Sequence, residues 1–175
     1  MTHQIFVDDS LRPESYFLVS VAIPSNLIER LRREMRNTLP NHGKQLHMYK
    51  ETTATKKRAL NFVAQLDLKF TIISNYRNGI SKVQARSECI TKLCALKIIQ
   101  SASFLTFDST NSWEIDRRIL KSAAQSSANF FPTYRHVSSK SEPLLWLPDI
   151  IAWSWGRGSD WKCQISHLIH EIILD

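Results

Sequence analysis

Ile5-Phe6-Val7-Asp8-Asp9-Ser10, close to the start of the chain, is a short apolar run that ends in two adjacent carboxylates. Aromatic and β-branched side chains favour a strand, and the carboxyl ends of strands are where open α/β sheets bind ligands. Asp and Ser also satisfy the backbone of a turn with their own side chains. The stretch therefore predicts the first strand of a sheet, and Asp8 and Asp9 are either candidates for chemistry or part of a polar hairpin turn.

After this strand the chain continues as a hairpin and then as alternating helical and extended patterns. The aromatic and β-branched segment 16–23 stops at Pro24 and is expected to pair with the first strand across the polar turn at 9–15. Further extended patterns occupy 45–50, 68–74, 103–107 and 134–140, and helical patterns occupy 25–38, 53–66, 81–101, 112–126, 143–155 and 160–174. This order predicts an α/β fold, a mixed sheet of about five strands with an N-terminal antiparallel hairpin and helices on both faces.

Length and composition predict a single domain over 1–175. The 175 residues are 43% apolar and 22% charged, and no segment is biased enough in composition to predict disorder. Lys and Arg exceed Asp and Glu by 23 to 16, and the isoelectric point is near 9.5. A basic chain favours polyanions as partners, nucleic acid before an anionic membrane surface.

The cysteines and the N-terminus predict a cytoplasmic protein. Cys89, Cys94 and Cys163 are odd in number and lie in apolar helical patterns, which is typical of reduced, buried thiols. The chain begins with a strand pattern instead of a signal peptide, and no apolar run approaches the length of a membrane span. We therefore expect no membrane partner, and the sequence leaves the oligomeric state open.

Three acids recur in comparable positions, with Asp8 after the first strand, Asp108 after the strand at 103–107, and Asp149 in an apolar helical segment. Each acid has an ordinary explanation, because a turn, a helix cap or the first turn of a helix also favours Asp. Acids that follow distant strands can also converge at one edge of a sheet, where their oxygens suit Mg²⁺ or Mn²⁺. Such ions activate water in phosphodiester hydrolysis, so the combination favours a metal site.

The same acids lie in three motifs that resemble the ribonuclease H-like superfamily and, within it, the family named domain of unknown function 3800. Val7-Asp8-Asp9-Ser10 is similar to that family's N-terminal Asp-Glu-Ser signature, and a hydrophobic strand follows it. Phe107-Asp108 ends a central strand, and Leu144-Leu145-Trp146-Leu147-Pro148-Asp149-Ile150-Ile151-Ala152-Trp153 is similar to the C-terminal Leu-Gln-x-Ala-Asp helix. The resemblance spans nearly the whole chain and implies a ribonuclease H-like mixed sheet.

The resemblance also implies roles for individual residues. It makes Asp8, Asp108 and Asp149 the metal-binding acids of a ribonuclease H-like site. The family's middle motif is an acid or Lys near the short extended piece, for which the candidates in this sequence are His47, Lys50 and Glu51. The motifs depart from the family at four positions: Asp9 replaces Glu, Leu11 stands where Gly commonly follows, and Trp146 and Pro148 replace the Gln and the small residue before the last acid.

Two hypotheses for function follow. The first is a nuclease that uses Mg²⁺ or Mn²⁺ to hydrolyse phosphodiester bonds of DNA or RNA, with Glu51 or His47 as a fourth ligand or proton-transfer group. The alternative is a catalytically inactive domain that binds nucleic acid or a protein partner in a defence or mobile-element system. In either case Asp9 is expected only to flank the site, because successive strand residues point to opposite faces.

A zinc site near the C-terminus is a weaker alternative. Cys163, His167 and His170 fall at helical spacings near Glu171. The segment lacks the His-Glu-x-x-His order and a second Cys pair at a suitable interval. These residues are therefore expected to be core and surface positions of a last helix.

Overall fold

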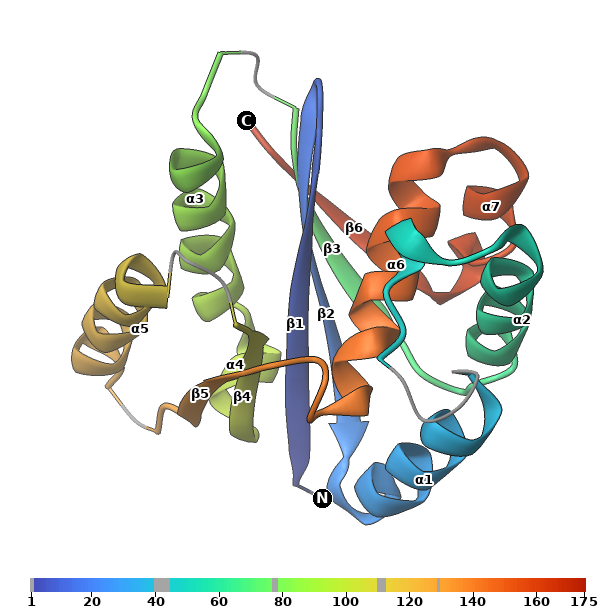
Figure 1. The fold of residues 1–175 in the computed structure, drawn as a ribbon. Helices are drawn as coiled ribbons and strands as arrows, with labels where there is room; N and C mark the ends of the chain where they lie inside the picture. Colours follow the sequence, from blue (N-terminus) through green and yellow to red (C-terminus); the bar gives the residue numbers. More distant parts are fainter. Residues whose placement is uncertain (1, 40–44, 77–78, 110–112, 129) are drawn as a thin grey trace.

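The computed structural model describes residues 2–39, 45–76, 79–109, 113–128 and 130–175. Within these ranges the strands are β1 (His3–Arg12), β2 (Ser15–Pro24), β3 (Phe70–Asn75), β4 (Ala102–Asp108), β5 (Thr133–Val137) and β6 (Ile169–Leu174). They form one mixed sheet in the order β5-β4-β1-β2-β3-β6 (Figure 1). The β1-β2 hairpin and the β2-β3 pair are antiparallel, whereas β4 adds in parallel to β1, β5 to β4 and β6 to β3.

Helices cover both faces of the sheet (Figure 1). One face carries α1 (Ile28–Thr38), α2 (Thr53–Ala64), α6 (Trp146–Arg157) and α7 (Ser159–Cys163). The other face carries α3 (Lys82–Cys94), α4 (Lys97–Gln100) and α5 (Trp113–Ser126). Short 3-10 turns complete the described elements: η1 (Ser25–Leu27), η3 (Met48–Lys50), η4 (Pro143–Leu145) and η5 (Ser166–Leu168). The predicted α/β class, the N-terminal hairpin and the two helical layers are confirmed.

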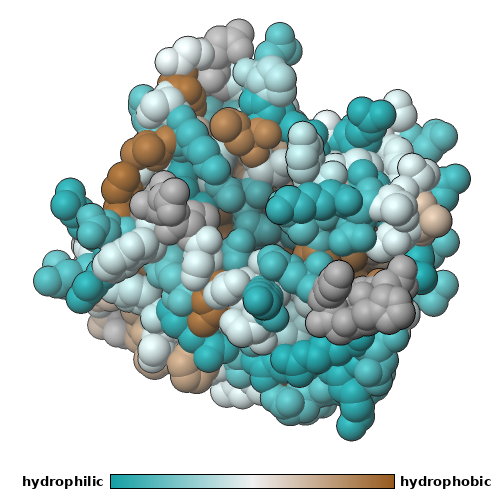
Figure 2. Space-filling view, viewed as in Figure 1, coloured by the Kyte–Doolittle hydropathy of each residue, from teal (hydrophilic) through white to brown (hydrophobic). Residues whose placement is uncertain are grey.

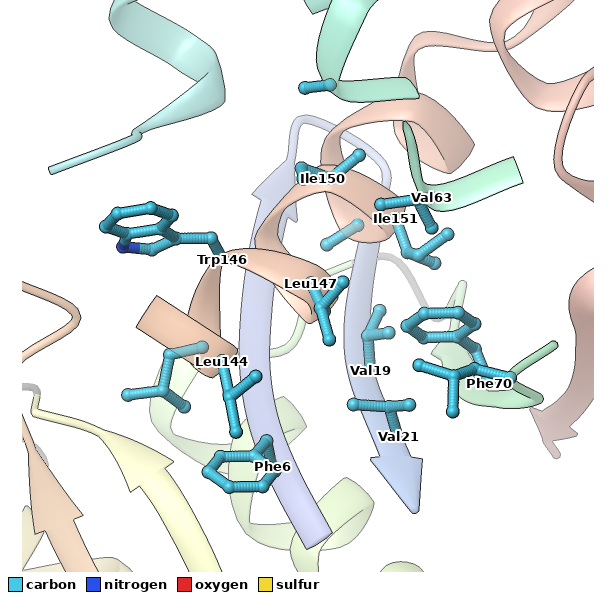
Figure 3. Close-up of a cluster of buried hydrophobic side chains, with 14 of the residues drawn as sticks. Phe6, Val19, Val21, Val63, Phe70, Leu144, Trp146, Leu147, Ile150 and Ile151 are labelled. Carbon is cyan, nitrogen blue, oxygen red and sulfur yellow. The ribbon is translucent and has the colours of Figure 1, made fainter. Parts of the chain in front are cut away.

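β1 lies in the middle of the sheet next to β2, and its side chains contribute to both hydrophobic cores. Phe6 packs in the core beneath α1, α2 and α6, and Ile5 and Val7 pack in the core beneath α3 and α5. Figure 3 shows the first of these cores, in which Leu147 and Ile151 of α6 join Phe6. A strand covered on both faces has a continuous apolar run, which explains the sequence of β1 before its two acids.

α6 is the helix that sets one side of the candidate site, and polar contacts hold it at both ends. Glu142, buried just before η4, accepts bonds from Arg32 Nε (3.0 Å) and Nη2 (2.6 Å) of α1. At the other end, Arg12 Nη2 of β1 donates to the carbonyl of Trp153 (3.1 Å). A Cβ at Gly156 would lie 2.5 Å from Arg12 Nε, so the arginine occupies the space that this glycine leaves. α6 therefore cannot slide along β1 without breaking these contacts.

The last segment of the chain corrects a sequence prediction. The pattern at 160–174 predicts one amphipathic helix, but the structure has α7, η5 and then the strand β6, which pairs in parallel with β3 from Phe70↔Ile169 to Asn75↔Leu174. Apolar residues at 165, 168, 169 and 172 imitate a helical period, whereas the Ile-rich 169–174 suits a strand. Pairing with an open sheet edge overrides the helical pattern and gives the sheet a sixth strand.

Two other predicted elements differ in detail. The helix expected over 81–101 ends at Cys94, and the short α4 follows. The piece expected to be extended over 45–50 closes as the 3-10 turn η3. Among the described helices, none is both long and apolar enough to cross a bilayer.

Candidate functional site

Asp8 and Asp108 lie side by side where the parallel pairing of β1 with β4 ends; β4 stops at Asp108, whereas β1 continues to Arg12 in its pairing with β2. The β1-β4 register pairs Val7 with Phe107, so each acid is the next residue after a paired position. Val7 and Phe107 point into the core beneath α3 and α5. Because side chains alternate along a strand, Asp8 and Asp108 point to the opposite face, where α6 packs.

Asp149, in the first turn of α6, completes the acidic side of a polar cavity. Its Oδ2 accepts a bond from the backbone N–H of Met48 (2.9 Å), which ties α6 to the turn η3. The cavity has a volume of about 210 Å³ and is lined by Asp8, Asp9, Gln45, Leu46, His47, Asp108, Ser139 and Asp149. The structure thus brings the three predicted acids and His47 to one cavity.

The acids in this cavity repel one another. Burial, followed by the charges of Asp149, Asp9 and Asp108, raises the pKa of Asp8 well above its usual range, although the Asp9 N–H donates to Asp8 Oδ1 (2.7 Å). Burial also raises the pKa of Asp108, even though the Ser139 N–H donates to its Oδ1 (2.9 Å). Among the described ion pairs, none joins Asp8 or Asp108 to a Lys or Arg.

The chemistry of this donor set fits a hard divalent cation. Oxygen ligands from several carboxylates are what Mg²⁺ and Mn²⁺ prefer. A cation would offset the burial and the repulsion that together raise the pKa of Asp8. Over the part of the chain that the structure describes, no three His, Cys, Asp or Glu side chains are grouped so that they could hold a metal ion as they stand. The carboxylates would have to turn toward a shared ion.

His47 and Glu51, the candidates for a fourth group, are placed differently. His47 lines the cavity and its Nδ1 lies 3.5 Å from Asp149 Oδ2, a contact that raises the pKa of the imidazole. Glu51 lies outside the cavity lining and accepts a long bond (3.4 Å) from the backbone N–H of His47. The geometry favours His47 as the group that reaches the acids and Glu51 as a support for its backbone.

Sequence reasoning missed Gln45 and Ser139, which also line the cavity. Ser139 binds Asp108 through its backbone N–H as well as its side chain, and a backbone donor leaves no signal in residue identity. Asp9 also lines the cavity, but its carboxylate is held by Tyr16 and Arg86, residues of the opposite core and helix layer. The zinc alternative is not supported by the contacts of Glu171, which accepts bonds from Ser74 Oγ and Tyr76 Oη.

Comparison with known proteins supports the fold and not a closer relationship. The chain matches no protein-family model and no curated protein. Its structure is similar to that of Bst-RNase HIII in complex with Mn²⁺, with a TM-score of 0.51 and 12% sequence identity over 87% of this chain. The match covers 51% of the Bst-RNase HIII chain, so this chain spans about half of that protein's length. With its strand order and this similarity, the chain has a ribonuclease H-like fold.

Proposed function

We propose that this chain is a divalent-metal-dependent nuclease that hydrolyses phosphodiester bonds of DNA or RNA. The observation that carries the proposal is one cavity, lined by Asp8, Asp108 and Asp149, in which described Lys and Arg side chains form no ion pair with Asp8 or Asp108. Uncompensated buried carboxylates are costly to a fold, and they are retained where a ligand supplies the missing charge. The resemblance of the motifs to the domain of unknown function 3800 family agrees with this assignment.

In this proposal the three acids hold Mg²⁺ or Mn²⁺ between the middle of β1, the end of β4 and the first turn of α6. A bound divalent ion would supply an activated water and stabilise the leaving oxygen. His47 would hold or release a proton at its ring beside Asp149 Oδ2. The Met48 N–H orients the Asp149 carboxylate, and the Ser139 N–H orients that of Asp108.

The surface beside His47 suits a nucleic acid. Tyr49 is 77% exposed and Lys50 is exposed, and both belong to the same turn, η3, as the Met48 N–H that binds Asp149. An exposed aromatic ring offers a stacking surface for a base, and a lysine offers a cation for phosphate. The net charge of +7 favours the same partner, and the face shown in Figure 2 is predominantly hydrophilic.

A cleavage assay tests the proposal. Wild type, Asp8→Asn and Asp160→Asn are compared on single- and double-stranded DNA and RNA with Mg²⁺, Mn²⁺ or EDTA. Asp160 is an exposed acid on α7, outside the cavity, and serves as the matched control. We expect metal-dependent cleavage by wild type and by Asp160→Asn. The loss in Asp8→Asn should exceed the roughly 10–100-fold cost of disturbing a group that only supports a metal ligand. Equal activity in wild type and Asp8→Asn rejects the site.

A second candidate is a domain that binds nucleic acid without cleaving it. It is favoured because no three His, Cys, Asp or Glu side chains among the described residues are grouped so that they could hold a metal ion. Fluorescence anisotropy with the same nucleic acids separates the two. Metal-independent binding, unchanged in Asp8→Asn and without cleavage on any substrate, would establish this second function in place of the first.

A further inference from the structure

A buried ionic network lies on the face of the sheet opposite the acidic cavity. Arg86 of α3, 3% exposed, donates to Asp116 of α5 through Nε (2.8 Å) and Nη2 (2.7 Å), and Asp116 is fully buried. Arg86 Nη1 also lies 3.1 Å from Asp9 Oδ2 of β1. His136 Nε2 of β5 is 2.9 Å from Asp116 Oδ2. We call Asp9, Arg86, Asp116 and His136 the Arg86 network.

The Arg86 network reaches the sequence neighbours of two candidate metal ligands: it includes Asp9, next to Asp8, and it contacts Phe107, next to Asp108. Asp9 follows Asp8 directly, and its N–H donates to Asp8 Oδ1 (2.7 Å). At the other end, the His136 ring stacks on the ring of Phe107, with centroids 5.2 Å apart and planes 19° apart. Phe107 directly precedes Asp108. The network on one face therefore holds the strand backbone next to Asp8 and Asp108, whose side chains point to the other face.

Further contacts fix the orientation of the side chains in the Arg86 network. Tyr16 Oη donates to Asp9 Oδ2 (2.7 Å), and Lys82 Nζ lies 3.6 Å from the same oxygen. The two parallel bonds between Arg86 and Asp116 fix the orientation of both groups. Buried ion clusters of this kind are often no more stabilising than apolar side chains of equal volume. Geometry is thus the better explanation for keeping these charges.

We propose that the Arg86 network positions the candidate metal site by fixing β1 at Asp8 and Asp9 relative to the end of β4, so that Asp8 and Asp108 can bind one metal ion. Arg86, Asp116 and His136 are positioning residues, because they act through Asp9 and Phe107 and touch neither candidate ligand directly. The inference rests on the proposed nuclease function for its purpose. Its structural content, the coupling of the two carboxylates to the reverse face, is measurable without metal or substrate.

Three variants separate positioning from general destabilisation. His136→Leu removes the bond to Asp116 at the edge strand β5, and His136→Gln keeps an amide donor for that bond. Ile90→Ala is the matched control: Ile90 is fully buried on α3, one turn after Arg86, and lies outside the network. Urea unfolding measures the loss in the free energy of unfolding for each of the three variants.

The first readout is the pair of backbone amide resonances of Asp9 and Ser139 in metal-free protein. These N–H groups donate to Asp8 Oδ1 and Asp108 Oδ1, so their chemical shifts report both carboxylates. We expect His136→Leu to shift both resonances, His136→Gln to return them toward wild type and Ile90→Ala to leave them in place. If His136→Leu moves them no more than Ile90→Ala does, the positioning inference is overturned.

The second readout is a Mg²⁺ titration of the same resonances, followed by cleavage kinetics. We expect His136→Leu to lose about 10–100-fold in Mg²⁺ affinity and to lower kcat with KM unchanged, and Ile90→Ala to retain both. Equal Mg²⁺ affinity in wild type and His136→Leu overturns the inference. A wild type whose two amides do not respond to Mg²⁺ rejects the metal site, while the metal-free comparison still decides the coupling.

Discussion

Asp8 and Asp9 are neighbours in sequence and have opposite surroundings. The Asp9 carboxylate lies 3.1 Å from Arg86 and 3.6 Å from Lys82, and it accepts a bond from Tyr16. Asp8 faces Asp149 and Asp108, and burial with these charges raises its pKa well above the usual range. The difference teaches that compensation of charge, and not residue type, separates an acid that holds the fold together from one that is free for a ligand.

The same contrast recurs between Asp108 and Asp116. Burial raises the pKa of Asp108 in the cavity. Burial acts in the same direction on Asp116, but the hydrogen bonds and charges of Arg86 and His136 outweigh it and lower the pKa of Asp116. One face of the sheet therefore carries acids whose charge lacks a partner, and the other carries acids whose charge is balanced by neighbouring cations.

The largest expected effect comes from breaking the compensated face. Arg86→Met leaves Asp116 and Asp9 without their buried cation, and removal of one partner from a buried ion pair costs about 3–5 kcal/mol. We expect a loss of this size in the free energy of unfolding, measured by urea titration. Arg86→Met combined with Asp116→Leu should recover part of the loss. A single variant as stable as wild type would contradict the compensation described for this face.

Neutralising the uncompensated face should have the opposite sign. Asp8→Asn removes a buried charge that its neighbours repel, so we expect the metal-free variant to be more stable than wild type by about 1 kcal/mol, in the range of common stabilising substitutions. Thermal unfolding in EDTA measures the change, with Asp160→Asn as the exposed control. If Asp8→Asn destabilises the metal-free protein, the charge of Asp8 is compensated after all.

The pH dependence of this gain follows from the direction of the pKa shift. A raised pKa in the folded state means that folded Asp8 binds its proton more tightly than unfolded Asp8, whose pKa is about 3.9. Wild type and Asp8→Asn should therefore be equally stable below about pH 3.9. The advantage of Asp8→Asn over wild type should grow as the pH rises from there to the folded pKa.

Asp116, whose pKa is lowered, should show the opposite pH dependence. Wild type should lose its stability advantage over Asp116→Asn as the pH falls below about 3.9.

The smallest expected effect is a shift in the titration of His47. The bond to Asp149 raises the pKa of His47 above its usual value of about 6.5. In metal-free protein, Asp149→Asn should lower that pKa, and ring-proton NMR measures it. The ring-proton resonances of His170, which is exposed on β6 and lies outside the cavity lining, serve as the reference signal. A His47 pKa that is the same in both proteins would show that the imidazole does not sense the acidic cavity.

Much of the fold can be predicted from the sequence because neighbouring residues specify many of its elements. The apolar run before Asp8, the segment before Pro24 and the Ser-Glu-Pro start at 141–143 each specify an element through neighbouring residues. β6 cannot be predicted in this way, because its apolar spacing also fits a helix. Only pairing with the open edge of β3 selects a strand over a helix. Parallel pairing across nearly 100 residues has no local signal.

The candidate site can be predicted only in part, because some of its residues interact with partners that are distant in sequence. Asp8, Asp108 and Asp149 stand out because each follows or interrupts an apolar segment. Arg86, Asp116 and His136 look like surface charges in the sequence, and their separations of 30 and 20 residues hide the buried network that they form. Ser139 contributes a backbone donor that any residue except proline supplies.

The contact between Arg12 and Gly156 has a consequence for the evolution of the chain. Any side chain at 156 would meet the guanidinium group unless Arg12 withdrew, and its bond to the Trp153 carbonyl would then be lost. The two positions are therefore expected to covary among homologues, with a larger residue at 156 accompanied by a shorter one at 12. Such paired changes would show that natural selection keeps the Asp149 helix in register with the strand of Asp8.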